Sequence, residues 1–502
     1  MALALVAAVA VLRAPGFAVG IVNLDECDFA LFGRMVQAGA VPYLGVADIK
    51  PPLTYVASHL AERLAGGPSF TAIHLLGVAA ILATALLLRA AARAWTGDDR
   101  AGWAAAWLSV LAVVCESPAV NAEILMNVPV AAALLAAVLA ERRGLLRLDV
   151  ASGIAIGVAT LVKQQAGIAL VALGVAYLVP LVSRGAASRR PLLRAGALAA
   201  GFCLPWAAAA AVAASYDWPS FYSWVIARNL HQVQAARSFS WLRAAGSVAL
   251  CLAATALPWG LAVRRAARPR DAIATALALL LALTFIPVSL GGRFYEHYFL
   301  QFAPPLALLG APELAALARR FAGLGRLRRG ALVALALLPF LGSVGYATAR
   351  GVARDFPSQD PKANVIAAWL RANTRPGDRV FLWGDFSVVY CLAERLPGTR
   401  YMRTAPHIGD FDPLQLPPGP PAHRFRSETD IALTLSDLTA NRPAVVVDTS
   451  PADLHGWSRF PLADLPDVDG YVREHYVAAA APAGAVVYLR KDAGATPAAL
   501  KR

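Results

Sequence analysis

This chain is constrained above all by a succession of long apolar stretches. Each approaches the ~20 residues that a helix needs to cross the ~30 Å hydrocarbon core of a bilayer. Hydrophobic residues make up 58% of the 502 residues and charged residues 16%, whereas soluble domains average about 45–50% and about 25%. A soluble globular protein is therefore excluded. The stretches lie at 71–88, 102–115, 124–140, 150–162, 166–183, 195–215, 244–262, 272–290, 297–312 and 330–347.

Two parts of this pattern leave alternatives open. Only twelve residues precede Arg13, too few for a full span, so either the start is truncated or the first helix is short and tilted. The stretches at 150–162 and 166–183 are interpreted as two helices joined by a tight turn at 163–165, although one broken helix also fits. Counting the first helix, about eleven transmembrane helices are predicted. No cleavable signal peptide is indicated, because the charged region that would open it is missing.

The net charge of +14 has a topological origin. Nineteen arginines fall in alternate loops between the apolar stretches, and by the positive-inside rule those loops are cytoplasmic. The positive charge is therefore no sign of a nucleic-acid partner. The other loops, and everything after about residue 350, are predicted on the outer side of the plasma membrane.

The composition changes after residue 350, where polar residues increase and no further span follows. We predict a transmembrane domain over 1–349, with its first outer loop at 23–70, and an extracytoplasmic α/β domain with a short tail over 350–502. The predicted helices of the second domain lie near 360–373, 386–395 and 428–440. Its predicted strands lie at 379–383 and 444–447 and near 474–479 and 484–490.

The five cysteines are too few and too scattered to indicate a disulfide framework, and no Cys-x-x-Cys pair suggests zinc. No metal-binding residues are predicted.

Acidic residues open the first outer loop, in the run Asn23-Leu24-Asp25-Glu26-Cys27-Asp28. Carboxylates at the end of a spanning segment are costly unless they have a function or a partner. Asp25 is also a good N-cap for a helix over 27–38. Spacing alone leaves both interpretations open.

Lysine is rare in this chain, which has only five, and two of them lie in tight outer turns at Lys50 and Lys163. A compact ammonium suits a phosphate oxygen as a point charge. The alternative is a lysine that reaches from a helix end toward water.

Three further outer segments carry polar residues. Glu123 lies where a helix re-enters the membrane, Arg293, Tyr295 and His297 lie at another helix end, and the loop at 216–241 carries Arg228 and His231 among aromatic residues. Most of those aromatic residues suit the headgroup belt. If the topology is correct, all the outer segments lie on one face, where they could form one cavity.

The order of these motifs resembles the first outer loop of GT-C glycosyltransferases, in particular the protein-mannosyltransferase-like subgroup that includes the lipid A aminoarabinose transferases. The motifs are Asp25-Glu26, Gly39-x-x-Pro42-Tyr43 and Asp48-x-Lys50-Pro51-Pro52. Weaker similarity extends to Asn121-x-Glu123, to Leu161-Val162-Lys163-Gln164-Gln165-Ala166-Gly167, to Arg293-Phe294-Tyr295-x-His297-Tyr298, and to Val380-Phe381-Leu382-Trp383-Gly384 with Tyr390.

This resemblance implies a GT-C fold and the inverting transfer of a hexose or pentose from a polyprenyl-phosphate-linked donor. The acceptor would be a protein, lipopolysaccharide or another envelope glycan. Asp25 matches the catalytic base and Glu123 a second-loop carboxylate, while Lys50 matches the cation on the donor phosphate. Further candidates for the phosphate are Lys163, Arg293 and His297, and further substrate contacts are Glu26, Asp48, Tyr43, Arg228, His231 and Tyr295.

One position departs from the aminoarabinose transferases. Ile49 replaces the Glu that precedes their turn lysine. This argues against a structural metal site of their kind and against that sugar, while a need for a divalent metal stays open. The lipid-linked donor carries its own leaving group, which fits the lack of a nucleotide-binding motif.

The sequence leaves two other functions open. A transporter or lipid flippase would place ionisable residues near the bilayer midplane, often in related halves, but here the charges cluster at the outer ends and no repeat is found. A sensor or scaffold would make Asp25 and Lys50 dispensable. The sequence identifies neither the sugar nor the acceptor.

Overall fold

The computed structural model of the chain divides into two compact units, and each is described by itself. Unit 1 comprises 1–18, 50–215 and 239–351, and unit 2 comprises 19–49, 216–238 and 352–502. The last division lies close to the predicted domain boundary, but residues 19–49 and 216–238, which fall in the predicted transmembrane domain, belong to unit 2. The structure describes residues 1–116, 118–184, 189–230, 241–269, 271–290, 292–321, 323–409 and 426–492.

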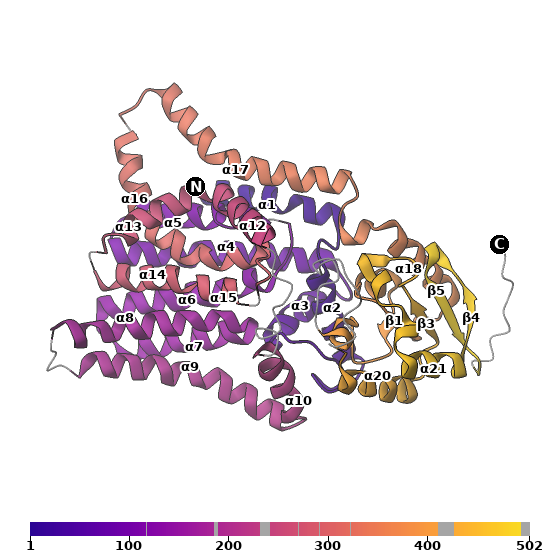
Figure 1. Ribbon diagram of the computed structural model, residues 1–502. Helices are drawn as coiled ribbons and strands as arrows, with labels where there is room; N and C mark the ends of the chain where they lie inside the picture. The colour runs from indigo at the N-terminus through magenta and orange to yellow at the C-terminus, as the bar shows by residue number, and fades with distance from the viewer. Residues whose placement is uncertain are drawn as a thin grey trace. The chain divides into compact units, whose positions relative to one another are not determined.

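Unit 1 is a bundle of apolar helices, of which α4, α6, α7, α8 and α9 run side by side (Figure 1). Its helices are α1 (Ala2–Val19), α3 (Pro52–Leu64), α4 (Phe70–Thr96), α5 (Asp99–Leu111), α6 (Ala122–Arg143), α7 (Leu146–Val162), α8 (Ile168–Arg184), α9 (Arg190–Ala214), α12 (Trp241–Ala254), α13 (Ala256–Ala266), α14 (Ala272–Leu283), α15 (Phe285–Ser289), α16 (Ala303–Phe321) and α17 (Arg326–Val352). Three short 3-10 helices join them, η1 (Val114–Glu116), η2 (Gln164–Gly167) and η4 (Glu296–Phe302).

Every predicted apolar stretch contains a helix, but not every helix is long. Within the described residues, seven helices are long and apolar enough to cross a membrane, or eight if α12 and α13, which bend by 86°, form one span. Helices α5 and α7 have only 13 and 17 residues. The number of about eleven spans therefore stays a prediction.

The first helix is longer than the twelve residues that precede Arg13. Helix α1 continues through Pro15 and reaches 18 residues. Arg13 is fully buried, and its Nη1 donates to the carbonyl oxygen of Ala119 at 2.6 Å. A buried arginine needs such a partner, and this contact explains how the helix accommodates it. Further along, α7 and α8 are separate helices with a turn at Lys163, as expected.

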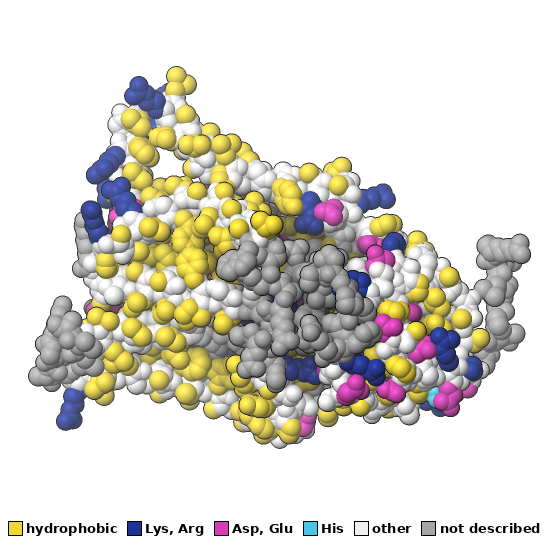
Figure 2. All heavy atoms as spheres, in the orientation of Figure 1, with side chains coloured by type: hydrophobic (Ala, Val, Ile, Leu, Met, Phe, Trp, Pro, Cys, Tyr) yellow, Lys and Arg dark blue, Asp and Glu magenta, His cyan; other side chains and the backbone are white. Residues whose placement is uncertain are grey.

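Hydrophobic side chains cover much of the visible face of unit 1 (Figure 2). On α9 and α17 they are exposed, as at Leu193 (56%) and Leu335 (62%), which suits contact with lipid. Inside the bundle, α7 and α9 approach closely because their contact is made of small residues. A Cβ on Gly153 would lie 2.0 Å from the carbonyl oxygen of Leu198.

Unit 2 contains a five-stranded mixed sheet in the order β2-β1-β3-β5-β4 (Figure 1). Strand β1 (Arg379–Trp383) is parallel to β2 (Leu396–Pro397) and β3 (Val445–Asp448), whereas β5 (Val486–Arg490) is antiparallel to β3 and to β4 (Tyr476–Ala480). Strands β1 and β3 are almost wholly buried, as is typical of strands covered on both faces. Their apolar side chains pack with Trp457 and Leu438 into one core.

The helices of unit 2 lie in residues 352–502, together with the sheet, and in the segments 19–49 and 216–238. They are α2 (Leu24–Gln37), α10 (Trp218–Tyr222), α18 (Pro361–Asn373), α19 (Val388–Ala393), α20 (Glu428–Asn441) and α21 (Pro466–His475). Shorter turns are the π-helix η3 (Ser223–Ala227) and the 3-10 helices η5 (Pro357–Gln359), η6 (Ala405–Ile408), η9 (Leu454–Arg459), η10 (Leu462–Asp464) and η11 (Pro482–Gly484). The predicted helices and strands are all present, while β2 and α21 were missed.

Candidate active site

Helix α2 of unit 2 carries the acidic motif and begins after Asn23. The side chain of Asn23 accepts a hydrogen bond from the Glu26 amide at 3.1 Å, and Glu26 Oε2 accepts one from the Val22 amide at 2.8 Å. The first bond makes Asn23 the N-cap of α2, and the second ties the Glu26 carboxylate to the backbone just before the cap. The interpretation of Asp25 as the N-cap is therefore wrong. Asp25 lies in the first turn and is partly exposed, whereas Glu26 is fully buried.

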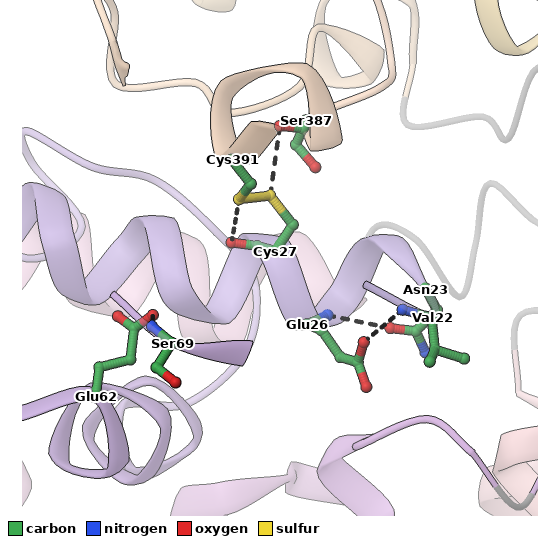
Figure 3. The surroundings of a disulfide bond; sticks show 8 residues. All are labelled: Val22, Asn23, Glu26, Cys27, Glu62, Ser69, Ser387 and Cys391. Atoms are coloured by element: carbon green, nitrogen blue, oxygen red, sulfur yellow. Dashed lines mark hydrogen bonds between the residues drawn. A yellow bond between two sulfur atoms is a disulfide. The ribbon is translucent and has the colours of Figure 1, made fainter. Parts of the chain in front are cut away.

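A disulfide joins Cys27 of α2 to Cys391 of α19 (Figure 3). The two cysteines are 364 residues apart in sequence, so their spacing gave no signal for the bond. The sequence indicated no disulfide framework, and it did not predict this bond. Among the described residues this is a single disulfide. It fixes α2 one residue before Asp28.

Asp28 is the second carboxylate on the same side of α2 as Asp25, three residues further on. It is fully buried, and its Oδ2 lies 3.0 Å from Nη2 of Arg403. Burial by itself would lower the pKa of Arg403, but surrounding negative charge outweighs burial, and the pKa is raised. That charge comes from the carboxylates of Asp28, Asp385, Asp25 and Asp48.

The loop after α2 is held by aromatic packing. Tyr43 is fully buried and has a φ of 65°, and its ring lies 5.3 Å from that of Phe32 and 5.4 Å from that of Phe221. Burial, then the charge of Asp48, raises the pKa of Tyr43 well above its usual value. Asp48 in turn accepts a hydrogen bond from the Ile49 amide at 2.6 Å. In this conformation Tyr43 and Asp48 shape the loop.

Arg228 has partners within unit 2. Its guanidinium contacts the carboxylate of Asp430 and lies 3.9 Å from the ring centroid of Trp224. The same Asp430 oxygen accepts a hydrogen bond from the Tyr401 hydroxyl at 2.6 Å. These contacts connect the end of η3 to α20 within unit 2. His231 lies outside the described residues.

Unit 1 brings Glu123 and Lys163 together. Glu123, in the first turn of α6, is fully buried, and its Oε1 contacts Nζ of Lys163. Lys163 is the C-cap of α7 in an extended conformation, and its side chain is 10% exposed. Two residues predicted for separate roles thus form one buried ion pair.

The segment that carries Arg293 adjoins this pair. Nζ of Lys163 lies 4.7 Å from the ring centroid of Tyr298. That ring lies 4.8 Å from the ring of His297, which stacks on Tyr295 at 5.3 Å. Three predicted residues of unit 1, Lys163, His297 and Tyr295, are therefore linked through ring contacts.

The turn that contains Lys50 is anchored to the same region of unit 1. Thr54, in the first turn of α3, donates from Oγ1 to the carbonyl oxygen of Val162 at 2.6 Å. Val162 immediately precedes Lys163. The predicted phosphate-binding residues Lys50, Lys163, Arg293 and His297 all belong to unit 1, while the acidic motif belongs to unit 2.

Comparisons with known proteins cover most of this architecture. Residues 49–208 match the family model of dolichyl-phosphate-mannose-protein mannosyltransferases. The crystal structure of ArnT from Cupriavidus metallidurans bound to undecaprenyl phosphate aligns with a TM-score of 0.60 over 96% of each chain, at 18% identity. The Archaeoglobus fulgidus oligosaccharyltransferase AglB, in complex with an inhibitory peptide and a dolichol-phosphate, aligns with a TM-score of 0.54 at 15% identity, over 98% of this chain and 74% of its own. No curated protein matches the chain by sequence.

The chain has the GT-C fold. The fold that the sequence resemblance implies is thereby confirmed. Within this GT-C fold, the family match begins at the Lys50 turn and includes Glu123 and Lys163, whereas Asp25 precedes it. In the part of the chain that the structure describes, no group of three or more His, Cys, Asp or Glu residues is placed to hold a metal ion.

Several charged residues around the acidic motif of this GT-C chain were not predicted from the sequence. Asp28 belongs to the acidic motif but no role was predicted for it, and Asp385 and Arg403 lie in the C-terminal part of the chain, where the sequence predicted only helices and strands. A carboxylate at position 28, one turn after Asp25, is a signal that helix periodicity offers. Arg403 gave none, because its partner is 375 residues away in the sequence.

Proposed function

We propose that this protein is an inverting glycosyltransferase that moves a hexose or pentose from a polyprenyl-phosphate donor to an envelope acceptor. The observation that carries the proposal is the acidic first turn of α2 in a GT-C fold, where Asn23 performs the capping and Asp25 does not. The comparison with ArnT bound to undecaprenyl phosphate supports the donor class. The acceptor is a protein, lipopolysaccharide or another glycan.

The proposed reaction is a single displacement at the anomeric carbon. The acceptor oxygen forms the new glycosidic bond while the bond to the phosphate oxygen breaks, and the polyprenyl phosphate leaves with that electron pair. Asp25 removes the acceptor proton as a general base. Lys50 stabilises the charge that develops on the leaving phosphate.

Lys163, Arg293 and His297 are proposed as further contacts of the donor. Lys163 is held by Glu123 and Tyr298 in unit 1, so its ammonium is fixed before a substrate arrives. We assign Glu123 the role of holding that ammonium. A fixed cation lowers the reorganisation needed as the phosphate gains charge.

The reaction is proposed to take place on the outer face of the plasma membrane. The arginine-rich loops indicate that the other loops are outside. The Cys27–Cys391 disulfide of unit 2 supports the same side, because disulfides persist in oxidising compartments.

A deletion strain tests the proposal through mass spectrometry of its envelope glycans. We expect one glycan to lack a hexose or pentose, and the wild-type gene to restore it. Asp25→Asn should fail to restore the sugar at normal protein levels. Asn23→Ala is the matched control, because it removes only a helix cap, at a cost of about 1 kcal/mol.

Two results would contradict this proposal. An unchanged glycan profile in the deletion strain would remove the transferase function, and solute transport by purified protein in vesicles without a glycosyl product would favour the transporter. Full restoration by Asp25→Asn would remove Asp25 as the base.

A further inference from the structure

The surroundings of α2 in unit 2 are unusually acidic. The carboxylates of Asp25 and Asp28 lie on one side of the helix, and those of Asp48 and Asp385 contribute to the same field around Arg403. Carboxylates placed near one another disfavour each other's ionised form. A general base in such a cluster would hold its proton unless a cation balanced the group.

Arg403 is a cation in direct contact with this cluster, through Asp28. Its Nη2 lies 3.0 Å from Oδ2 of Asp28, whose side chain is fully buried, while 32% of the Arg403 side chain is exposed. An ionised carboxylate so deeply buried requires a charged partner. Guanidinium stays protonated in proteins, so this partner keeps its charge at every working pH.

The chain holds Arg403 on both sides. Tyr401, two residues before Arg403, forms a parallel bridge with Ala47. The carbonyl oxygen of Arg400 accepts a hydrogen bond from the Ala47 amide at 2.9 Å. The following residue, Thr404, donates its amide to the carbonyl oxygen of Gly384 at 3.1 Å.

Side chains add to this support. Arg400 pairs through two nitrogens with the carboxylate of Asp437, at 2.9 and 2.8 Å. The opposite partner is fixed as well, because the disulfide at Cys27 adjoins Asp28. Both halves of the ion pair are therefore built into place before any substrate binds.

We propose that Arg403 is a positioning residue that keeps the acidic turn of α2 ionised, and so sets the protonation state of Asp25. The inference rests on the proposed role of Asp25 as the base. It gives residues 352–502 a supporting role in catalysis, because they supply Arg403 to the acidic turn.

Carboxyl labelling tests this without a sugar substrate. Dicyclohexylcarbodiimide modifies protonated carboxyl groups, and mass spectrometry of the full-length protein gives the extent of Asp25 modification from pH 4 to pH 9. In Arg403→Ala, we expect Asp25 to be modified at a pH about one to two units higher than in the wild type, because a nearby cation has been lost. Arg403→Lys keeps the cation and should stay near the wild type.

Two further variants test the direction in which neighbouring charge moves the pH of Asp25 modification. Asp28→Asn removes a negative neighbour and should move the modification of Asp25 to lower pH, and the double variant with Arg403→Ala should lie between the single ones. Arg473→Ala, which removes an exposed arginine paired with Asp469 on α21, is the matched control and should change nothing. Peptide mapping of the Cys27–Cys391 bond verifies that each variant is folded.

The inference is overturned if Arg403→Ala leaves the pH of Asp25 modification at the wild-type position. If Arg403→Ala does not fold, Asp28→Asn decides instead, and the inference is overturned if that variant does not move the modification of Asp25 to lower pH. The proposed function fails separately, if Asp25→Asn restores the missing sugar. The two failures are distinguishable because labelling requires neither donor nor acceptor.

Discussion

Cys27 and Cys391 join α2 covalently to α19, two residues after Asp25. The bond closes a loop of 364 residues, and it fixes the helix that carries the acidic motif against the sheet domain within unit 2. A constraint on the unfolded chain of this kind stabilises the native state.

Removal of this disulfide should therefore destabilise the protein. Cys391→Ser is expected to lower the free energy of unfolding by roughly 2–4 kcal/mol. Thermal unfolding of the full chain in detergent, followed by resistance to trypsin, measures the loss. Cys203→Ser is the matched control, because Cys203 is an exposed free cysteine of α9. Equal stability of the two variants would contradict the prediction.

The ion pair of Glu123 and Lys163 predicts a non-additive double-mutant cycle. Lys163→Met alone leaves the buried carboxylate of Glu123 without its cation, a change that typically costs about 3–5 kcal/mol. Adding Glu123→Gln removes that charge and should recover most of the stability. Denaturant unfolding measures both, and Arg473→Met, at an exposed ion pair, should have little effect.

The same double variant separates structure from function. If Lys163 contacts the donor phosphate, the stable double variant should still fail to restore the envelope sugar in the deletion strain. Restoration would show that the pair serves only the packing of unit 1. Additive losses of stability would contradict the buried ion pair itself.

His407 predicts a dependence of stability on pH. Its imidazole is fully buried, Nδ1 donates to the Thr404 carbonyl oxygen at 3.1 Å, and Nε2 lies 2.6 Å from Thr434 Oγ1, where the neutral ring accepts. Burial lowers the pKa of His407 from 6.5 to about 4. The unfolded chain therefore takes up the proton first as the pH falls.

Stability contributed by neutral His407 should accordingly be present above pH 6.5 and be lost between pH 6.5 and about 4, by roughly 3 kcal/mol in all. Thermal unfolding across this range measures the slope. His407→Gln should lower the overall stability and flatten the slope. His475→Gln, at a partly exposed site on α21, should leave the slope unchanged, and a slope unaffected by His407→Gln would contradict the assignment.

Local patterns allowed much of this architecture to be predicted from the sequence. Strand β1 was predicted with its exact bounds, Arg379–Trp383, because a short apolar run bounded by polar residues is typical of a buried strand. Helix α18 and strand β3 were placed within one residue for similar reasons. Strand β2 was missed because two residues, one of them Pro397, carry no periodicity.

Long-range relationships were beyond reach. The Asn23 cap is local, yet Asp25 is an equally good capping residue, and only the geometry separates them. The Cys27–Cys391 bond and the Asp28–Arg403 pair join residues more than 360 positions apart. No spacing rule in a single sequence encodes such pairs, because they depend on how the chain folds back on itself.

The side of the membrane that holds unit 2 gives a final prediction. Alkaline phosphatase becomes active only where its own disulfides form, so a fusion after Arg502 should be active in cells if unit 2 lies outside. A fusion after Gly144, in the connection between α6 and α7, should be inactive because that arginine-rich segment is predicted to be cytoplasmic. Immunoblots of both fusions control for expression. Activity at Gly144 and none at Arg502 would reverse the topology, and the Cys27–Cys391 bond would then have to form in a reducing compartment.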